Sequence, residues 1–163
     1  MVFLARRLAQ ERGEVTTLGV AGFAVAETLL NGGAFELGQV ELDSLTLPPT
    51  TAATAGLVGT LTAVHAKSTA LNGRSGEAAA AMDAAASMAD RFGELGEIDP
   101  LGLEFGPTWV GFRRVRLALD AGEPDCAVSI AEGLHPDQHP APYGRAFHWV
   151  GYGRALAAVA GTS

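Results

Sequence analysis

The sequence has a single cysteine, few charged side chains and fewer basic than acidic ones, and each scarcity excludes a class of protein. Cys126 alone cannot build an internal disulfide framework or a cysteine-rich zinc site, and we expect it to be a small packing residue. Charged residues are 18% of the chain against 48% hydrophobic ones, which opposes intrinsic disorder. The net charge of −7 opposes binding of DNA or RNA by this chain.

Signals for secretion and for membrane insertion are also missing. The first seven residues place their arginines after a short apolar stretch, which reverses the order of a secretory signal. Residues 44–66 carry no formal charge, but Pro48, Pro49 and several threonines and glycines make this run less apolar than a membrane span. We therefore expect a cytoplasmic protein in which this segment forms a helix surrounded by neighbours. The 163 residues fit one domain, 1–163.

Hydrophobic residues at helical spacing, interrupted by glycine and proline, predict an all-α fold of about eight helices. The alanine-rich stretch gives the strongest signal, because alanine is the best helix former. No stretch alternates apolar and polar residues for long enough to predict a strand, so 94–105 is a predicted loop. The predicted helices span residues 2–12, 15–31, 34–45, 50–72, 75–92, 107–121, 123–134 and from 141 or 142 to 160.

Glycines at the turns group these helices into antiparallel hairpins. Gly73 separates helices 50–72 and 75–92, and Gly122 separates the next two. The pattern predicts stacked hairpins, a TPR-like α-solenoid, with a generic helical bundle as the alternative. Small residues stand where the helices of a tetratricopeptide unit touch, namely Ala66, Ala78 and Ala85 around Gly73, and Ala118 and Ala127 around Gly122.

Several segments together carry a family resemblance, which covers most of the chain and is strongest in 105–122. They are Phe105-Gly106-Pro107-Thr108-Trp109-Val110, Arg113-Arg114-Val115, Leu117-Ala118-Leu119-Asp120-Ala121-Gly122-Glu123, Ala5-Arg6-Arg7-Leu8-Ala9 with Glu11-Arg12-Gly13, Thr62-Ala63-Val64-His65-Ala66, Arg145-Ala146 and Arg154-Ala155-Leu156-Ala157. With these segments the chain resembles the C-terminal TPR-like sensor region of actinobacterial XRE-family helix-turn-helix regulators. The resemblance implies an effector-sensing, dimerising module, and the use of arginine in place of nearly all lysine suits an actinobacterial source.

The chain also departs from that family. No helix-turn-helix precedes Met1, so we expect no direct nucleic-acid binding and a domain truncated at both ends. Trp109 stands where the family usually has an Asn that holds a peptide backbone, and Gly151 stands where it often has Asp. The end helices would each lack a pairing helix. We expect a second copy, or sequence outside this chain, to cover them.

The histidines predict no metal site. His135 and His139 lie in a proline-rich segment that prevents the helical spacing needed to bring two imidazoles to one ion, so we expect a solvated loop there. His65 and His148 lie among apolar residues on predicted helices, and we expect core or groove positions for both. They are the only candidates for a catalytic acid or base, a role that requires them to meet across the groove.

Aromatic and basic residues gather on 107–121 and 141–160. Trp109 and Phe112 share a helical face, as do His148 and Tyr152. This cluster predicts either plain core or an apolar groove whose polar groups orient a ligand. Arginines at 113, 114 and 116 suit a carboxylate or an acidic partner. The predicted ligand-binding residues are Trp109, Phe112, Arg113, His148 and Tyr152.

Together these patterns predict a non-catalytic domain that binds a small apolar molecule or a peptide. The binding surface is the concave side of 50–72, 107–121 and 141–160. We expect a homodimer and no cofactor, with ligand occupancy shifting hairpin packing and dimer geometry. Two alternatives stay open: a small cyclase-like biosynthetic enzyme using His65 or His148, and a pure dimerisation module. A closed aromatic cavity holding a histidine favours the enzyme, and an open groove favours binding.

Overall fold

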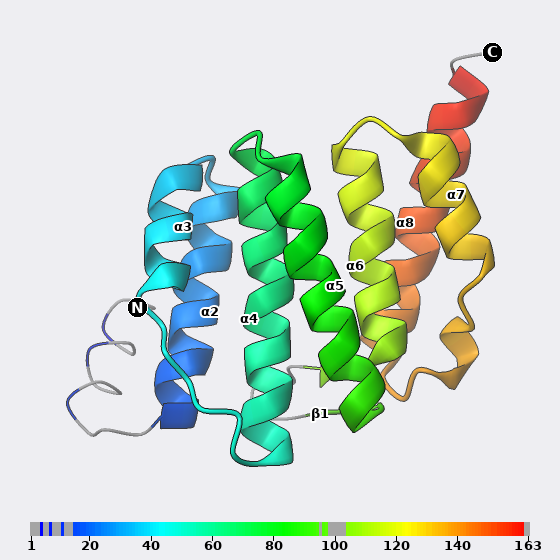
Figure 1. The fold of residues 1–163 in the computed structure, drawn as a ribbon. Coiled ribbons are helices and arrows are strands. Elements are labelled where there is room, and N and C mark those ends of the chain that lie inside the picture. Colours follow the sequence, from blue (N-terminus) through cyan, green and yellow to red (C-terminus); the bar gives the residue numbers. More distant parts are fainter. Residues whose placement is uncertain are drawn as a thin grey trace.

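The computed structural model describes Leu4, Arg7, Glu11 and residues 15–94, 96–97 and 104–161. The described residues form an all-α fold, as predicted (Figure 1). The predicted helix 2–12 falls almost entirely outside the described residues. The helices are α2 (Val15–Asn31), α3 (Phe35–Asp43), α4 (Ala52–Leu71), α5 (Ser75–Phe92), α6 (Pro107–Asp120), α7 (Pro124–Glu132) and α8 (Pro142–Gly161), with a short 3₁₀ helix, η1 (Pro136–Gln138).

The helices form hairpins that stack in chain order (Figure 1). Each pair packs within itself, α2 on α3, α4 on α5 and α6 on α7. The first helices of the pairs also contact one another, α2 with α4, α4 with α6 and α6 with α8. We call α2, α4, α6 and α8 the first helices, and α3, α5 and α7 the second helices. The predicted surface of 50–72, 107–121 and 141–160 therefore corresponds to three neighbouring first helices.

The three hairpin turns share one backbone geometry. Gly33, Gly73 and Gly122 have φ of 80°, 77° and 77°, a region that favours glycine. In the second turn, the N–H of Arg74 donates to the carbonyl of Thr69 at 3.0 Å, and the other two turns repeat this bond. The pattern is a Schellman motif, which satisfies the last carbonyls of the first helix and reverses the chain.

The core is divided along the stack into three clusters of buried side chains, each of which combines one hairpin with the first helix that follows it. The predicted small residues lie at these contacts. Ala66 and Ala85 belong to the second cluster, and Ala118 and Ala127 to the third. Ala78 is also buried, at 2% exposure. Because these side chains are short, the helix axes can approach closely.

The uncharged run 44–66 enters the most enclosed helix, α4. Thr51 caps it: the N–H of Thr54 donates to Thr51 Oγ1 at 3.1 Å, and the N–H of Thr51 donates to Thr54 Oγ1 at 2.9 Å. Buried residues occur on most sides of the helix, as expected for a helix between neighbours. None of the described helices is both long enough and apolar enough to cross a membrane.

The predicted loop 94–105 is partly wrong. Two short antiparallel strands, β1 (Gly96–Glu97) and β2 (Glu104–Phe105), pair within it. Two residues are too few to produce an alternating pattern in sequence. The pair carries Phe105 into the second core cluster, where it is fully buried against Gly59 of α4.

Candidate functional site

The predicted ligand-binding residues meet at the contact between α6 and α8. Trp109, Phe112 and His148 are 8%, 2% and 3% exposed, so their rings form much of this contact. The ring of Phe112 lies 5.2 Å from that of His148, and His148 lies 6.0 Å from Tyr152. Helical spacing places these rings on the facing sides of the two helices.

Arg113 lies over two aromatic rings. Its guanidinium carbon is 4.6 Å from the ring centre of Trp109 and 5.7 Å from that of Phe147. This geometry provides cation–π attraction from two helices. Burial lowers the pKa of Arg113 below its ordinary value, while the carboxylate of Glu27 acts in the opposite direction. The arginine stays charged, because a guanidinium keeps its proton throughout the physiological pH range.

A charged network that the sequence did not predict joins three first helices. Glu27 of α2 lies 3.0 Å from Lys67 Nζ of α4 and 3.6 Å from Arg113 Nη1 of α6. Lys67 also donates to Asn31 Oδ1 at 3.2 Å. Glu27 is the only Asp, Glu, Lys or Arg on α2, and Lys67 is the only one on α4. A single charged residue on each of two apolar helices was therefore the sequence feature that could have indicated an ion pair between them. We call the surface around Glu27, Lys67, Arg113 and Phe147 the first-helix surface.

Two small cavities open between α6 and α8 beside these residues. Each has a volume of about 30 Å³, which admits one or two water molecules. Glu104, Arg113 and Tyr143 line one, and Arg116, His148 and Arg154 line the other. Both cavities are bounded by Phe112 and Phe147. A large closed chamber of the kind a cyclase needs is not present among the described residues of this contact.

His148 and Tyr152 differ in how their polar atoms are satisfied. Tyr152 donates its hydroxyl to Glu132 of α7 at 3.3 Å, and burial together with that carboxylate raises the pKa of Tyr152. Burial lowers the pKa of His148, so the ring is neutral at pH 7. Nδ1 of His148 is buried and has no hydrogen-bond partner within the described part of the chain.

The solvated-loop prediction is wrong for His139, although His135 is exposed. His139 is 1% exposed, and its Nε2 lies 2.6 Å from Oε2 of Glu104, which is itself 6% exposed. The ring packs edge-on against Phe112 and fills the space beside Gly144, where a Cβ would collide with it. The pair fixes the start of α8 to β2. The partners are 35 positions apart in the sequence, so local sequence patterns could not predict the pair.

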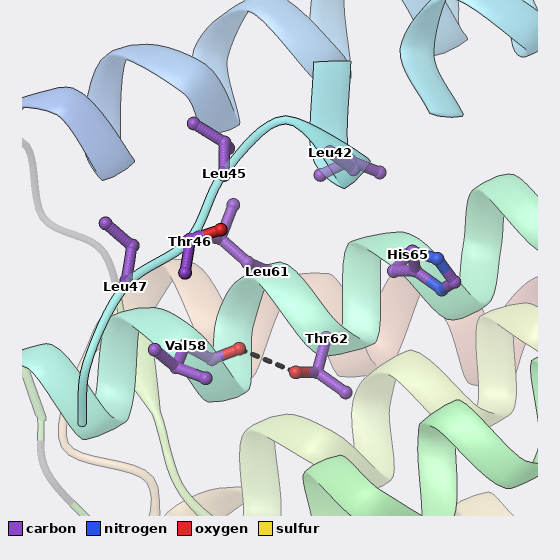
Figure 2. Close-up of a pocket in the computed structure, with 8 residues that line it drawn as sticks. All are labelled: Leu42, Leu45, Thr46, Leu47, Val58, Leu61, Thr62 and His65. Carbon is purple, nitrogen blue, oxygen red and sulfur yellow. Dashed lines mark hydrogen bonds between the residues drawn. The ribbon is translucent and has the colours of Figure 1, made fainter. Parts of the chain in front are cut away.

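The two larger pockets lie elsewhere. One, of about 310 Å³, lies between α4 and the connection from α3, and Figure 2 shows Leu45 and Leu47 on that connection across from Val58 of α4. His65 also lines this pocket. Its Nε2 lies 3.3 Å from Asp43 Oδ1 and its Nδ1 3.3 Å from Thr69 Oγ1, so both nitrogens face protein groups. His65 and His148 line different cavities.

The second large pocket, of about 320 Å³, is bounded by α5, α6 and α7. Met82 and Leu117 contribute apolar walls, and Asp83 and Arg114 form an ion pair of 2.6 Å at its edge. Both large pockets therefore lie where a second helix meets the next pair. The guanidinium of Arg114 faces this pocket, so Arg114 does not join Arg113 and Arg116 beside the small cavities.

Cys126 is exposed on α7, so the prediction of a packing role is wrong. Among the described residues, no group of three His, Cys, Asp or Glu side chains is arranged to hold a metal ion. Comparison with protein-family models gives no match, and comparisons with curated proteins and with solved structures also give none.

Proposed function

We propose that this chain is a non-catalytic, TPR-like binding domain related to the sensor region of XRE-family regulators. Its first-helix surface binds a small apolar molecule or a peptide, and as in that family the domain acts in the cytoplasm. Stacked hairpins suit this role, because consecutive first helices present side chains along one continuous surface. A ligand that contacts several of these helices favours one spacing of the hairpins. Ligand binding therefore changes how the hairpins pack on one another.

One observation carries the proposal: charge is divided between the two sets of helices although the chain is acidic overall. An apolar surface with a local positive charge suits a ligand that has both apolar and anionic parts. The first helices carry Lys67, Arg113, Arg114, Arg116, Arg145 and Arg154 against Glu27 and Asp120. The second helices carry Arg91 against Glu36, Glu41, Asp43, Glu77, Asp83, Asp90, Asp125 and Glu132.

The proposal includes a homodimer formed through α8. This helix has no acidic residue, and Ala146, Gly153 and Ala157 on its outward side are exposed. The solvent-facing side of a helix normally carries charged residues, so an uncharged outward side is typical of a covered one, and small residues let a second helix approach closely. Among the described residues, exposed large hydrophobic side chains occur only before α4 or on α8, as Leu4, Val15, Leu37, Val40, Tyr143, Trp149, Val150 and Leu156.

The binding role is tested by selecting ligands without assuming their identity. Native mass spectrometry of freshly purified protein detects a co-purifying small molecule, and a displayed peptide library detects a peptide. We expect binders that the double variant Lys67→Met with Arg113→Met loses, because it removes both cations around Glu27.

The matched control is Arg74→Met with Arg91→Met, which removes two cations from α5 and the turn before it. We expect this control to keep the binders. Binders that survive the first pair of substitutions and are lost with the second would contradict the proposed surface. Unfolding midpoints of both variants confirm that each protein stays folded.

A further inference from the structure

We infer that Arg116, Arg154 and His148 form a carboxylate site between α6 and α8, which binds a single carboxylate attached to an apolar body. This inference rests on the proposed function and names the class of ligand. The three residues line one of the two 30 Å³ cavities. That volume matches the size of a carboxylate group, and the rest of the ligand would lie outside the cavity on the open surface.

The two arginines have hydrogen-bond donors to spare. Arg116 uses Nε to bind Asp120, at 2.9 and 3.0 Å from the two carboxylate oxygens, and its terminal nitrogens have no partner among the described residues. Arg154 is exposed and has no ion pair in the same part of the chain. A guanidinium presents paired N–H groups that match the two oxygens of a carboxylate.

His148 places a buried, unpaired polar atom at the same cavity. It is 3% exposed, lines the cavity and has a buried Nδ1 with no hydrogen-bond partner in the described structure. Leaving such an atom unpaired is unfavourable, because it loses its hydrogen bond to water on folding and gains none in return. A neutral imidazole with its hydrogen on Nδ1 can donate to a carboxylate oxygen, so a bound carboxylate would remove this cost.

The local charge and the neighbouring side chains define the ligand. Two arginines against Asp120 leave one positive charge, which one carboxylate neutralises. A polyphosphate or a nucleic acid would bring several charges to a chain that is already at −7. Phe147 and the exposed Val150 border the cavity and offer an apolar surface beyond it. The ligand is therefore an apolar monocarboxylate, either a small acid or the C-terminus of an apolar peptide.

Calorimetric titration with four probes tests the site: octanoate, 1-octanol, and a leucine-rich tetrapeptide with a free or an amidated C-terminus. We expect an acid to bind about ten- to hundredfold more tightly than its neutral counterpart, as for charge-assisted hydrogen bonds. Preference for octanoate identifies a small acid, and preference for the free peptide identifies a peptide C-terminus. Either outcome supports the site.

Three variants locate the effect. Arg154→Met should remove most of the preference for the acid, whereas Arg114→Met, on α6 but paired with Asp83, should keep it. Arg154→Lys should give an intermediate preference, because it keeps the charge and loses the planar donor pair. Equal binding of acids and neutral counterparts would overturn the carboxylate site and leave the proposed binding surface standing. Failure of all four probes to bind would also overturn the site.

Discussion

Small residues and buried rings set how closely the elements of this protein approach. Gly59 of α4 is the clearest case, because a Cβ there would overlap the ring of Phe105 from β2. That ring is fully buried and packs 6.0 Å from Trp109, so it has little freedom to move away. The short strand pair and the start of α6 therefore depend on one missing methyl group in α4.

Gly59→Ala should destabilise the fold by about 1–3 kcal/mol, the usual cost of overpacking a filled core. Urea unfolding followed by circular dichroism measures the change. The control is Gly76→Ala in the first turn of α5, where an added Cβ meets nothing within 4 Å. That variant should keep or slightly raise the stability, because alanine favours a helix over glycine. An unchanged Gly59→Ala midpoint would contradict the packing of Phe105.

His148 should make stability fall in mild acid. Burial holds its pKa below the ordinary 6.5, so the unfolded chain binds the proton more readily than the native one. The stability from neutral His148 is complete above pH 6.5 and is lost as the pH falls through that value toward the lowered pKa. Urea unfolding at about pH 7.5 and about pH 5.5 should show a smaller loss in His148→Phe than in the wild type.

The exposed His135 provides the matched control for that experiment. His135→Gln should keep the wild-type loss of stability between the two pH values, because the ring lies at the surface. If His148→Phe and the wild type lose equal stability on acidification, the native protein does not hold His148 in its neutral form.

At the scale of helices, local sequence signals were sufficient to predict where each α-helix begins and ends. Each of the helices α2 to α8 begins and ends within two residues of its predicted limits, because glycine, proline and Thr51 act on the backbone next to them. The short helix η1 was not predicted. Partners distant in sequence were not predicted. Three contacts illustrate this: the strand pair, the pair of Glu104 with His139, and the pair of Glu27 with Lys67. Each joins segments that are separated in the sequence and share no repeating pattern of residues. The candidate site was therefore predicted as a cluster on two helices, without its charged partners.

The cap of α4 allows a measurement at this scale. Thr51→Ala removes the side-chain acceptor for the N–H of Thr54 and should cost about 1 kcal/mol of stability. Thr50→Ala, one residue earlier and also exposed, removes a hydroxyl outside the capping box and should change stability by less than about 0.5 kcal/mol. Equal unfolding midpoints for the two variants would contradict the capping role.

At the scale of the whole molecule, the C-terminal end of the stack is the surface on which we expect a second copy to bind. The hairpin of α4 and α5 packs against α2 and α3 on one side and against α6 on the other. In the described part of the chain, α8 packs mainly on α6 and α7 and also contacts η1. Val150 belongs to the open side of α8 and also borders the proposed carboxylate site. A partner on α8 and a ligand at that site would therefore contact the same side chain, which provides a direct route from occupancy to dimer geometry.

Sedimentation velocity should show a dimer of the 16.7 kDa chain, and Ala157→Arg should shift it to monomer. The new arginine would stand on the uncharged outward side of α8, where burial against a second helix would desolvate its charge. Ala80→Arg introduces the same side chain at an exposed position of α5 and should leave the dimer intact. A wild-type protein that stays monomeric at high concentration would contradict the dimer, and a dimer that survives Ala157→Arg would place the interface on another surface.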